Sequence, residues 1–252
     1  MISLDKQKLP RHIAVIMDGN GRWAKMHTIG RIFGHKKGAE AVRTTVRTCR
    51  EIGIKYLTLF AFSVENWSRP SEEIDALMSL LEEYLDKETK ELNEQGIKLQ
   101  TIGNVDSLYK TVLDKLDNSV KVTAGNEGMI LNLALSYGGR DEIIEAVKKI
   151  VEETQRGKIQ LKDITKEKFG NYLYTNNIPD PDLLIRTSGE YRISNFLLWQ
   201  MAYTEFFFTN VLWPDFGKKE LLKAIAEYQK RERRFGLTSE QLQKNITSNT
   251  KK

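Results

Sequence analysis

The chain has 252 residues, of which 40% are hydrophobic and 29% charged, with a formal net charge of +5 and a single cysteine. This length fits one large domain, and the lone Cys49 excludes an intramolecular disulfide or a cysteine-rich metal site. No apolar run is long enough to cross a bilayer and no signal-peptide core is present, so we expect a cytoplasmic protein. The charge is modest for a nucleic-acid binder, and it also fits an enzyme of anionic substrates or a protein that visits anionic membrane surfaces.

The first predicted strand is the apolar run Ile13–Met17, which ends at Asp18. A turn over residues 19–21 follows, with Arg22 and Trp23 behind it. Ligands of open α/β sheets bind at the carboxyl ends of the strands, and free N–H groups beside Arg22 suit a phosphate. A tight turn without a ligand would use the same residue types.

Later segments repeat the alternation of strand and helix. The spacing of apolar residues predicts further strands at Tyr56–Phe62, Ile97–Ile102, Met129–Leu135, Leu183–Arg186 and Phe206–Phe208. It predicts helices at Gly34–Glu51, from Pro70 with Ser71 as N-cap to Gly96, at Val105–Val122, Asp141–Gln155, Lys166–Tyr174 and Lys218–Phe235. This order predicts an α/β fold with a mainly parallel central sheet flanked by helices. We expect residues 1–236 to form one domain and residues 237–252 a polar, disordered tail.

Two further polar clusters follow predicted strands. Ser63–Pro70 comes after the second strand, and Arg186–Asn195 begins at the end of the fifth. Each of the three strand ends therefore carries arginine. A parallel sheet would gather them at one edge, which predicts a site for a polyanionic ligand.

Three stretches also carry a family resemblance. They read MDGNGRWA from Met17, FSVENWSRP from Phe62 and LLIRTSGEYRISNFLLWQ from Leu183. In this order they resemble the cis-prenyltransferases, most closely the bacterial enzymes that make undecaprenyl diphosphate. The resemblance implies about six parallel strands in one domain. It also implies an Mg²⁺-dependent transferase that adds isopentenyl diphosphate to an allylic diphosphate such as farnesyl diphosphate, giving a long polyprenyl diphosphate that carries cell-wall precursors.

The resemblance further implies the residues of the site. Catalysis falls to Asp18 and Asn66, and magnesium to Asp18 and Glu205. Substrate binding falls to Gly19, Asn20, Gly21, Arg22, Trp23, Arg31, His35, Ser63, Val64, Glu65, Trp67, Arg69, Arg186, Arg192, Ile193 and Ser194. The allylic diphosphate would be held by Gly19, Asn20, Gly21, Arg22, Arg31 and His35, and the isopentenyl diphosphate by Arg186, Arg192 and Ser194. The loop between the two sites would be lined by Ser63, Asn66, Trp67 and Arg69. The two tryptophans would wall the prenyl chain.

Some of these assignments have alternatives. Asn66 is linked to proton removal, but an amide is a poor base, so a diphosphate oxygen is an alternative acceptor. Glu205 could merely precede an apolar strand. Val64, Asn104 and Ser136 depart from the usual family residues, which affects fine positioning.

The working unit implied is a homodimer. Its contact would involve the segment Asn195–Phe208, the final helix and the aromatic residues Phe206, Phe207, Phe208, Trp199 and Trp213. Arg234–Gly236 resembles an element that reaches a neighbouring subunit's site in some family members. We expect no nucleic-acid partner and at most peripheral membrane contact, through the lipid product.

Rival functions remain at this point. A cis-prenyltransferase making shorter products is one. A dinucleotide-binding oxidoreductase is another, because Gly19, Gly21 and Ala24 fit a loose fingerprint, although Trp23 is bulky for close packing and no acid follows at the expected offset. An RNA- or membrane-binding module could use the basic run over 230–234, but glutamate interrupts it.

Overall fold

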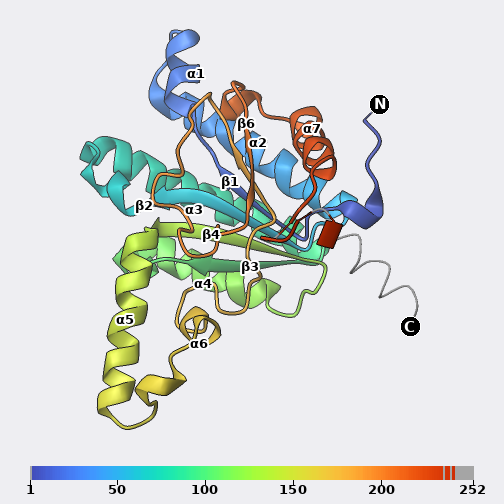
Figure 1. Cartoon of the computed structure of the whole chain (residues 1–252). Coiled ribbons are helices and arrows are strands. Elements are labelled where there is room, and N and C mark those ends of the chain that lie inside the picture. Colours follow the sequence, from blue (N-terminus) through green and yellow to red (C-terminus); the bar gives the residue numbers. More distant parts are fainter. Residues whose placement is uncertain (1, 235, 239, 242–252) are drawn as a thin grey trace.

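The computed structural model describes residues 2–234, 236–238 and 240–241, and its centre is a six-stranded sheet (Figure 1). The strands are β1 (His12–Ile16), β2 (Tyr56–Ser63), β3 (Ile97–Ile102), β4 (Met129–Tyr137), β5 (Leu183–Arg186) and β6 (Glu205–Phe208). They lie in the order β3-β4-β2-β1-β5-β6, and every neighbouring pair is parallel. The prediction of an α/β fold with a mainly parallel sheet of about six strands is confirmed.

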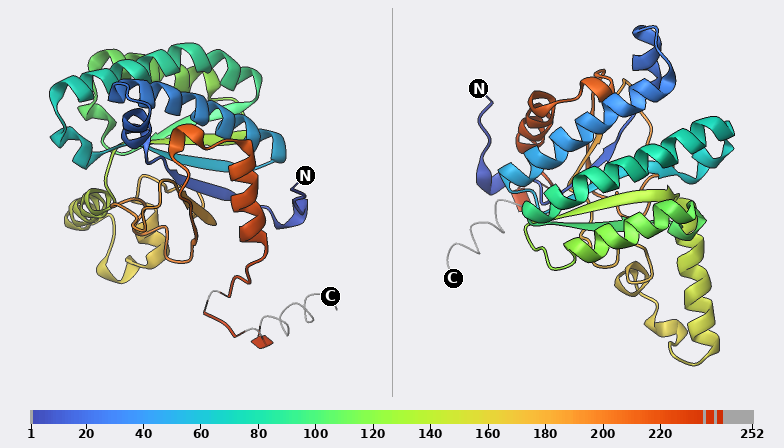
Figure 2. Two further views of the ribbon diagram at one scale, coloured as in Figure 1. Left: turned by 90° about the horizontal axis from the view of Figure 1, so that it is seen from above. Right: turned by 180° about the vertical axis from the view of Figure 1, so that it is seen from behind.

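Helices cover both faces of the sheet. They are α1 (Asn20–Met26), α2 (Arg31–Ile52), α3 (Ser71–Glu94), α4 (Lys110–Thr123), α5 (Gly139–Gln155), α6 (Lys166–Gly170) and α7 (Lys218–Gln229). Figure 2 shows α2, α3 and α4 as a layer along one face, with α5 and α6 on the other side. The larger part of the core lies under the first layer and also includes residues of α7. A smaller cluster on the opposite face is closed by Phe196, Leu197 and Met201.

Several boundaries differ from the sequence-based prediction: α2 begins at Arg31 rather than Gly34, α4 at Lys110 rather than Val105, and α6 ends at Gly170 rather than Tyr174. The segment after Asp18 is the start of α1 rather than a free turn. Gly34 explains the difference, because a Cβ there would lie 2.1 Å from the carbonyl oxygen of Asn20, so only glycine lets α1 pack directly on α2. The N-cap of α3 is Pro70 rather than the predicted Ser71. The last helix, α7, ends at Gln229 rather than at the predicted Phe235. Phe235 and most of the predicted tail lie outside the described residues.

Two residues without an assigned role belong to the core. Cys49 is fully buried. His12 is also buried, with Nδ1 2.6 Å from the Pro179 carbonyl oxygen and Nε2 2.7 Å from Thr58 Oγ1. Burial lowers the pKa of His12 to about 4, so the ring is neutral at physiological pH. Among the described helices, none combines the length and apolar character needed to span a membrane.

Candidate active site

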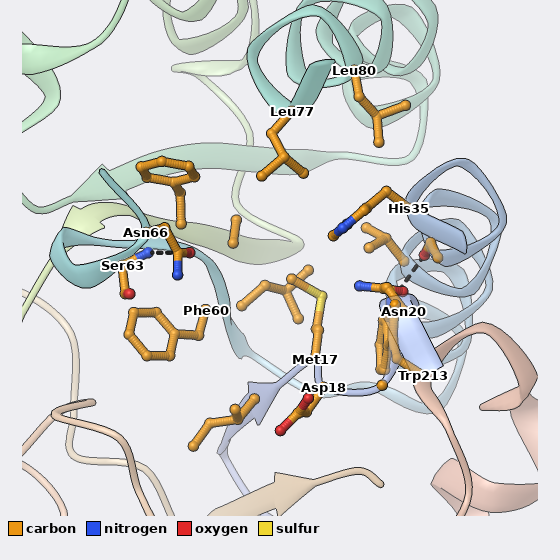
Figure 3. A pocket seen from close by; sticks show the side chains of 18 of the residues that line it. Met17, Asp18, Asn20, His35, Phe60, Ser63, Asn66, Leu77, Leu80 and Trp213 are labelled. Carbon is orange, nitrogen blue, oxygen red and sulfur yellow. Dashed lines mark hydrogen bonds between the residues drawn. The ribbon is translucent and has the colours of Figure 1, made fainter. Parts of the chain in front are cut away.

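The three polar strand ends meet at one edge of the sheet. β1 lies between β2 and β5, with Ile16 in register with Phe60 on one side and Arg186 on the other. A cavity of about 470 Å³ opens at this edge. Figure 3 shows Asn20 and His35 facing it from α1 and α2 and Asp18 from the segment after β1, with Ser63 and Asn66 across from them. The three clusters therefore form one site, as the sheet topology predicts.

Asp18 is fixed at the mouth of this cavity. Its Oδ2 accepts a 2.8 Å hydrogen bond from Arg186, and Arg22 lies 3.5 Å from Oδ1. The Asp18 backbone is held as well, because its N–H donates to Thr187 Oγ1 (2.9 Å) and its carbonyl accepts from the N–H of Trp213 (3.0 Å). A carboxylate constrained in this way keeps one orientation toward a ligand.

Arg186 connects Asp18 to the segment after β5. The side chain is only 3% exposed. One guanidinium nitrogen binds Asp18, and the other donates to Ser194 Oγ (2.7 Å) and to the carbonyl of Arg192. A planar arginine fork can make these bonds at once, which a lysine cannot.

Glu73 is an acid of the site that sequence reasoning missed. It lies in the first turn of α3, where an acid is expected simply to favour the helix dipole. Its carboxylate accepts from Arg31 (2.7 Å) and from Arg69 (3.0 Å). Two of the predicted phosphate ligands are thus held by one acid at the rim of the cavity. Glu190 does the same for Arg22 and Arg192.

His35 lies between these cations. Burial, followed by the positive charges of Arg69 and Arg31, lowers its pKa to about 4, and the charge of Glu73 only partly opposes them. The ring is therefore neutral at physiological pH in the absence of a bound anion.

The inner part of the cavity is apolar. Its walls come from α2, α3 and the sheet, and include Val42, Leu59, Phe62, Leu77, Met78, Leu80, Leu81, Tyr84 and Leu133. Leu77 and Leu80 point into it from α3 (Figure 3). Trp213, expected at a dimer contact, is instead 1% exposed and forms another wall, with its Nε1 bonded to the Gly38 carbonyl (2.9 Å). The cavity thus joins a charged mouth to an apolar interior.

Most predicted binding residues line this cavity, but Trp23, Val64, Glu65, Trp67 and Ile193 do not. The two tryptophans do not wall it because their indole N–H groups bind elsewhere. That of Trp23 donates to Asp215 (2.8 Å), and that of Trp67 donates to Ser136 Oγ (2.9 Å). Val64, Glu65 and Ile193 are sequence neighbours of lining residues. Glu65 accepts a hydrogen bond from Asn195, and Ile193 packs against the smaller core cluster.

Glu205 also departs from its expected place. It pairs with Leu183 at the beginning of β5, whereas Asp18 lies beyond the opposite end of β1. Its carboxylate binds Arg231 at 2.9 Å. Because the two acids lie at opposite ends of parallel strands, the expectation that both hold one metal ion is wrong for a single chain.

Comparison with known proteins identifies this architecture. The family model for undecaprenyl diphosphate synthases matches residues 16–236. The chain belongs to this family. It is 53% identical to an isoprenyl transferase of Clostridium tetani over 92% of this chain and 91% of that one. It is 51% identical to a ditrans,polycis-undecaprenyl-diphosphate synthase of Haemophilus influenzae, described as specific for (2E,6E)-farnesyl diphosphate, over 94% of this chain and 100% of that one.

A solved structure agrees with the family membership. Lavandulyl diphosphate synthase from Lavandula x intermedia, in complex with dimethylallyl diphosphate, superposes with a TM-score of 0.89 at 39% identity, covering 91% of this chain and 99% of that one. The resemblance to cis-prenyltransferases drawn from the motifs is confirmed, and the chain is a prenyl-transferring enzyme. The dinucleotide-binding oxidoreductase is not favoured.

Proposed function

We propose that the chain condenses isopentenyl diphosphate repeatedly, in cis, onto farnesyl diphosphate to give a long polyprenyl diphosphate such as undecaprenyl diphosphate, the lipid carrier of cell-wall synthesis. The observation that carries the proposal is a cavity of about 470 Å³ that joins a cationic mouth to an apolar interior. The mouth suits two diphosphates and the interior suits a growing hydrocarbon. The farnesyl diphosphate specificity ascribed to the Haemophilus influenzae relative supports farnesyl diphosphate as the primer.

The mouth divides between the two substrates in this proposal. The allylic diphosphate lies against the start of α1, with Arg22, Arg31, His35 and Arg69 as cationic or hydrogen-bonding partners. The isopentenyl diphosphate lies against Arg186, Arg192 and Ser194. Since the two groups flank Asp18, the carbon atoms that react would meet above β1. The arginines stabilise the charge that develops on the departing diphosphate.

The residues present fit a magnesium ion that arrives with its substrate. Among the described residues, no three histidine, cysteine or acidic side chains gather into a metal cage. Mg²⁺ commonly takes one or two carboxylates, with phosphate oxygens and water as its other ligands. Asp18 supplies such a carboxylate, and Glu205 could add a second only from another chain. Bound Mg²⁺ would neutralise charge on the leaving diphosphate.

The hydrogen bonding of Asn66 bears on which group accepts the substrate proton. Its Oδ1 already accepts a hydrogen bond from the backbone N–H of Ser63 (3.1 Å). An amide oxygen occupied in this way, and weakly basic, is a poor acceptor of a substrate proton. We therefore assign Asn66 to holding the loop after β2 and binding substrate, with a diphosphate oxygen as the base.

The direct test of the proposed function is incorporation of labelled isopentenyl diphosphate into butanol-extractable lipid, with farnesyl diphosphate and Mg²⁺ present. Chromatography of the product then measures chain length. The structural likeness to lavandulyl diphosphate synthase indicates that the fold does not itself set that length, so a shorter product is the alternative outcome. Absence of any Mg²⁺-dependent incorporation would refute the proposal.

Replacing Arg192 by alanine should weaken binding of isopentenyl diphosphate selectively. Arg192 lines the cavity beside Ser194, and its side chain is 59% exposed, so the fold should tolerate the change. Loss of a charged contact to phosphate should raise KM for isopentenyl diphosphate about thirtyfold or more, about 2 kcal/mol. Steady-state kinetics with each substrate varied measures the effect. Arg47→Ala is a matched control, since that exposed arginine pairs with Glu91 outside the cavity. Equal increases in both KM values would show that the two sites are not divided as proposed.

Binding of a diphosphate should raise the pKa of His35 from about 4 toward or above its ordinary value, because a nearby anion favours the imidazolium. The ring of His35 would then carry a proton in the complex that it lacks in the free protein. NMR titration of the imidazole resonances, without and with a farnesyl thiodiphosphate analogue, measures the shift. Buried His12, whose pKa is lowered for reasons remote from the cavity, is an internal control. An unchanged His35 titration would remove this residue from the diphosphate site.

We also propose a homodimer. Trp199, Tyr203 and Phe206 are 38%, 63% and 37% exposed in the single chain, an aromatic surface close in sequence to Glu205. Light scattering at micromolar concentration should give about twice the mass of one chain.

Deleting the chain from Arg234 onward should lower activity more than deleting it after Leu237, if 234–236 reach the other subunit's site. A fully active monomer would exclude the dimer, and equal activity of the two truncations would exclude the role of Arg234. Membrane contact in this proposal is peripheral, through the lipid product.

A further inference from the structure

Asn195 lies where three segments meet. Its side-chain Nδ2 donates to Glu65 Oε1 (2.9 Å), and its Oδ1 accepts from the backbone N–H of Arg140 (2.9 Å). Its carbonyl oxygen accepts from the backbone N–H of Gly139 (2.6 Å). One residue therefore ties the segment that follows Arg192 both to the start of α5 and to the short 3₁₀ helix η2 (Val64–Ser68).

The backbone around Asn195 is strained. Ser194 and Asn195 both adopt left-handed conformations, with φ of 50° and 61°. Left-handed conformations are uncommon outside glycine, and asparagine tolerates them better than most residues. Such strain persists only where the surroundings hold it. Here Arg186 holds Ser194 Oγ from one side, and the three hydrogen bonds of Asn195 hold the other.

The junction has no spare room. A Cβ on Gly138 would lie 2.8 Å from Asn195 Nδ2 and 2.8 Å from a methyl group of Val64, closer than real Cβ contacts. The start of α5, the Asn195 segment and η2 therefore touch directly. Glu65 faces Asn195 rather than the cavity. Partial burial alone would raise the pKa of Glu65, but hydrogen bonds, that from Asn195 foremost, keep it below its ordinary value, so Glu65 is an anion at neutral pH.

We propose that Glu65 and Asn195 are a positioning pair that aligns the two halves of the cavity mouth. One half of the mouth comes from β2 and the η2 region and carries Ser63, Asn66 and Arg69. The other half comes from the segment after β5, just before Asn195, and carries Arg192 and Ser194. This inference rests on the proposed function, in which each half holds one diphosphate. Condensation of two bound molecules depends on their relative placement, so the pair should act on kcat more than on either KM.

The test first replaces the hydrogen-bond donor of the pair, Asn195, by an acceptor and then gives Glu65 a donor in its place. Asn195→Asp keeps the shape, the tolerance of a left-handed φ and the acceptor for Arg140, but sets a second carboxylate against Glu65. We expect kcat to fall about tenfold, about 1.4 kcal/mol, with both KM values within about threefold of wild type. Glu65→Gln alone keeps an acceptor for Asn195, so kcat should fall by less than in N195D. In the double variant the glutamine amide can donate to the new carboxylate, and kcat should recover to within about threefold.

Two measurements, the split between kcat and KM and hydrogen exchange, together separate this pair from a merely structural role and from failure of the proposed function. Hydrogen exchange at the amides of 64–68, measured without substrate, should speed up in N195D and slow again in the double variant. Asn118→Asp, on the exposed face of α4, is a matched control that should change neither readout. An inactive wild type would refute the proposed function, while hydrogen exchange would still test the pair. If the second change fails to restore kcat and exchange, or if N195D raises only KM for isopentenyl diphosphate, the positioning pair is overturned.

Discussion

Asp18→Ala should lower kcat about a thousandfold, about 4 kcal/mol, while leaving the protein folded. Asp18 is fixed between Arg186 and Arg22 at the mouth of the cavity, and its side chain is 29% exposed. Its removal takes away the carboxylate that would bind Mg²⁺ and the partner that orients Arg186. The fold should survive because the Asp18 backbone remains held by Thr187 and Trp213, and Arg186 keeps its bond to Ser194.

The measurement is single-turnover condensation at saturating Mg²⁺, accompanied by thermal unfolding. Asp75→Ala is the matched control, since Asp75 is an exposed acid of α3 that binds Tyr109 and does not line the cavity. We expect the control to retain wild-type activity, and both variants to unfold within about 3 °C of wild type. An Asp18 variant that keeps about a tenth or more of the wild-type rate would show that the carboxylate has no such role.

The fold and the place of the site were predictable because they depend on local patterns. Apolar runs of strand length, separated by amphipathic helices, predict a parallel sheet whichever strand pairs with which. Asp18, Ser63 and Arg186 each end such a run, so their meeting at one edge follows from topology. The motifs that carry the family resemblance are these same strand ends, which is why resemblance and pattern converged on one site.

What the sequence could not predict depends on contacts between distant segments. Arg186 and Asp18 are 168 residues apart, and nothing local indicates that they pair. Glu73 has the pattern of a helix-start acid, and only the packing of α2 beside α3 places it against Arg31 and Arg69.

Side-chain direction was the other source of error. Aromatic residues next to a binding motif can face the ligand or the core, and Trp67 faces Ser136 while Trp213 forms a cavity wall. Glu205 was misplaced for a related reason, which lies in the sheet rather than in the side chain. The end of the strand at which a residue lies depends on register, and β6 begins where Glu205 stands. The sequence motif alone therefore could not show that Glu205 and Asp18 lie at opposite ends of their strands.

Arg186→Lys should lower activity strongly, although it is a conservative change. The arginine fork reaches Asp18, Ser194 and the Arg192 carbonyl together from a buried position, and a single ammonium group cannot replace this geometry. We expect kcat/KM for isopentenyl diphosphate to fall about a hundredfold, about 2.7 kcal/mol, mostly through kcat because Asp18 loses its orientation.

Comparison with Arg192→Ala isolates this bridging role. Arg192 contacts one side of the mouth only, so its loss should appear in KM, whereas the loss of Arg186 should appear in kcat as well. Arg43→Lys is the matched control, because Arg43 also sits in a partly buried ion pair, with Glu88, but lies outside the cavity. Kinetics with each substrate varied, beside circular dichroism of each variant, provide the measurement. If Arg186→Lys changed only KM for isopentenyl diphosphate, Arg186 would be an ordinary phosphate ligand, and the link that it makes between Asp18 and Ser194 would have no part in the reaction.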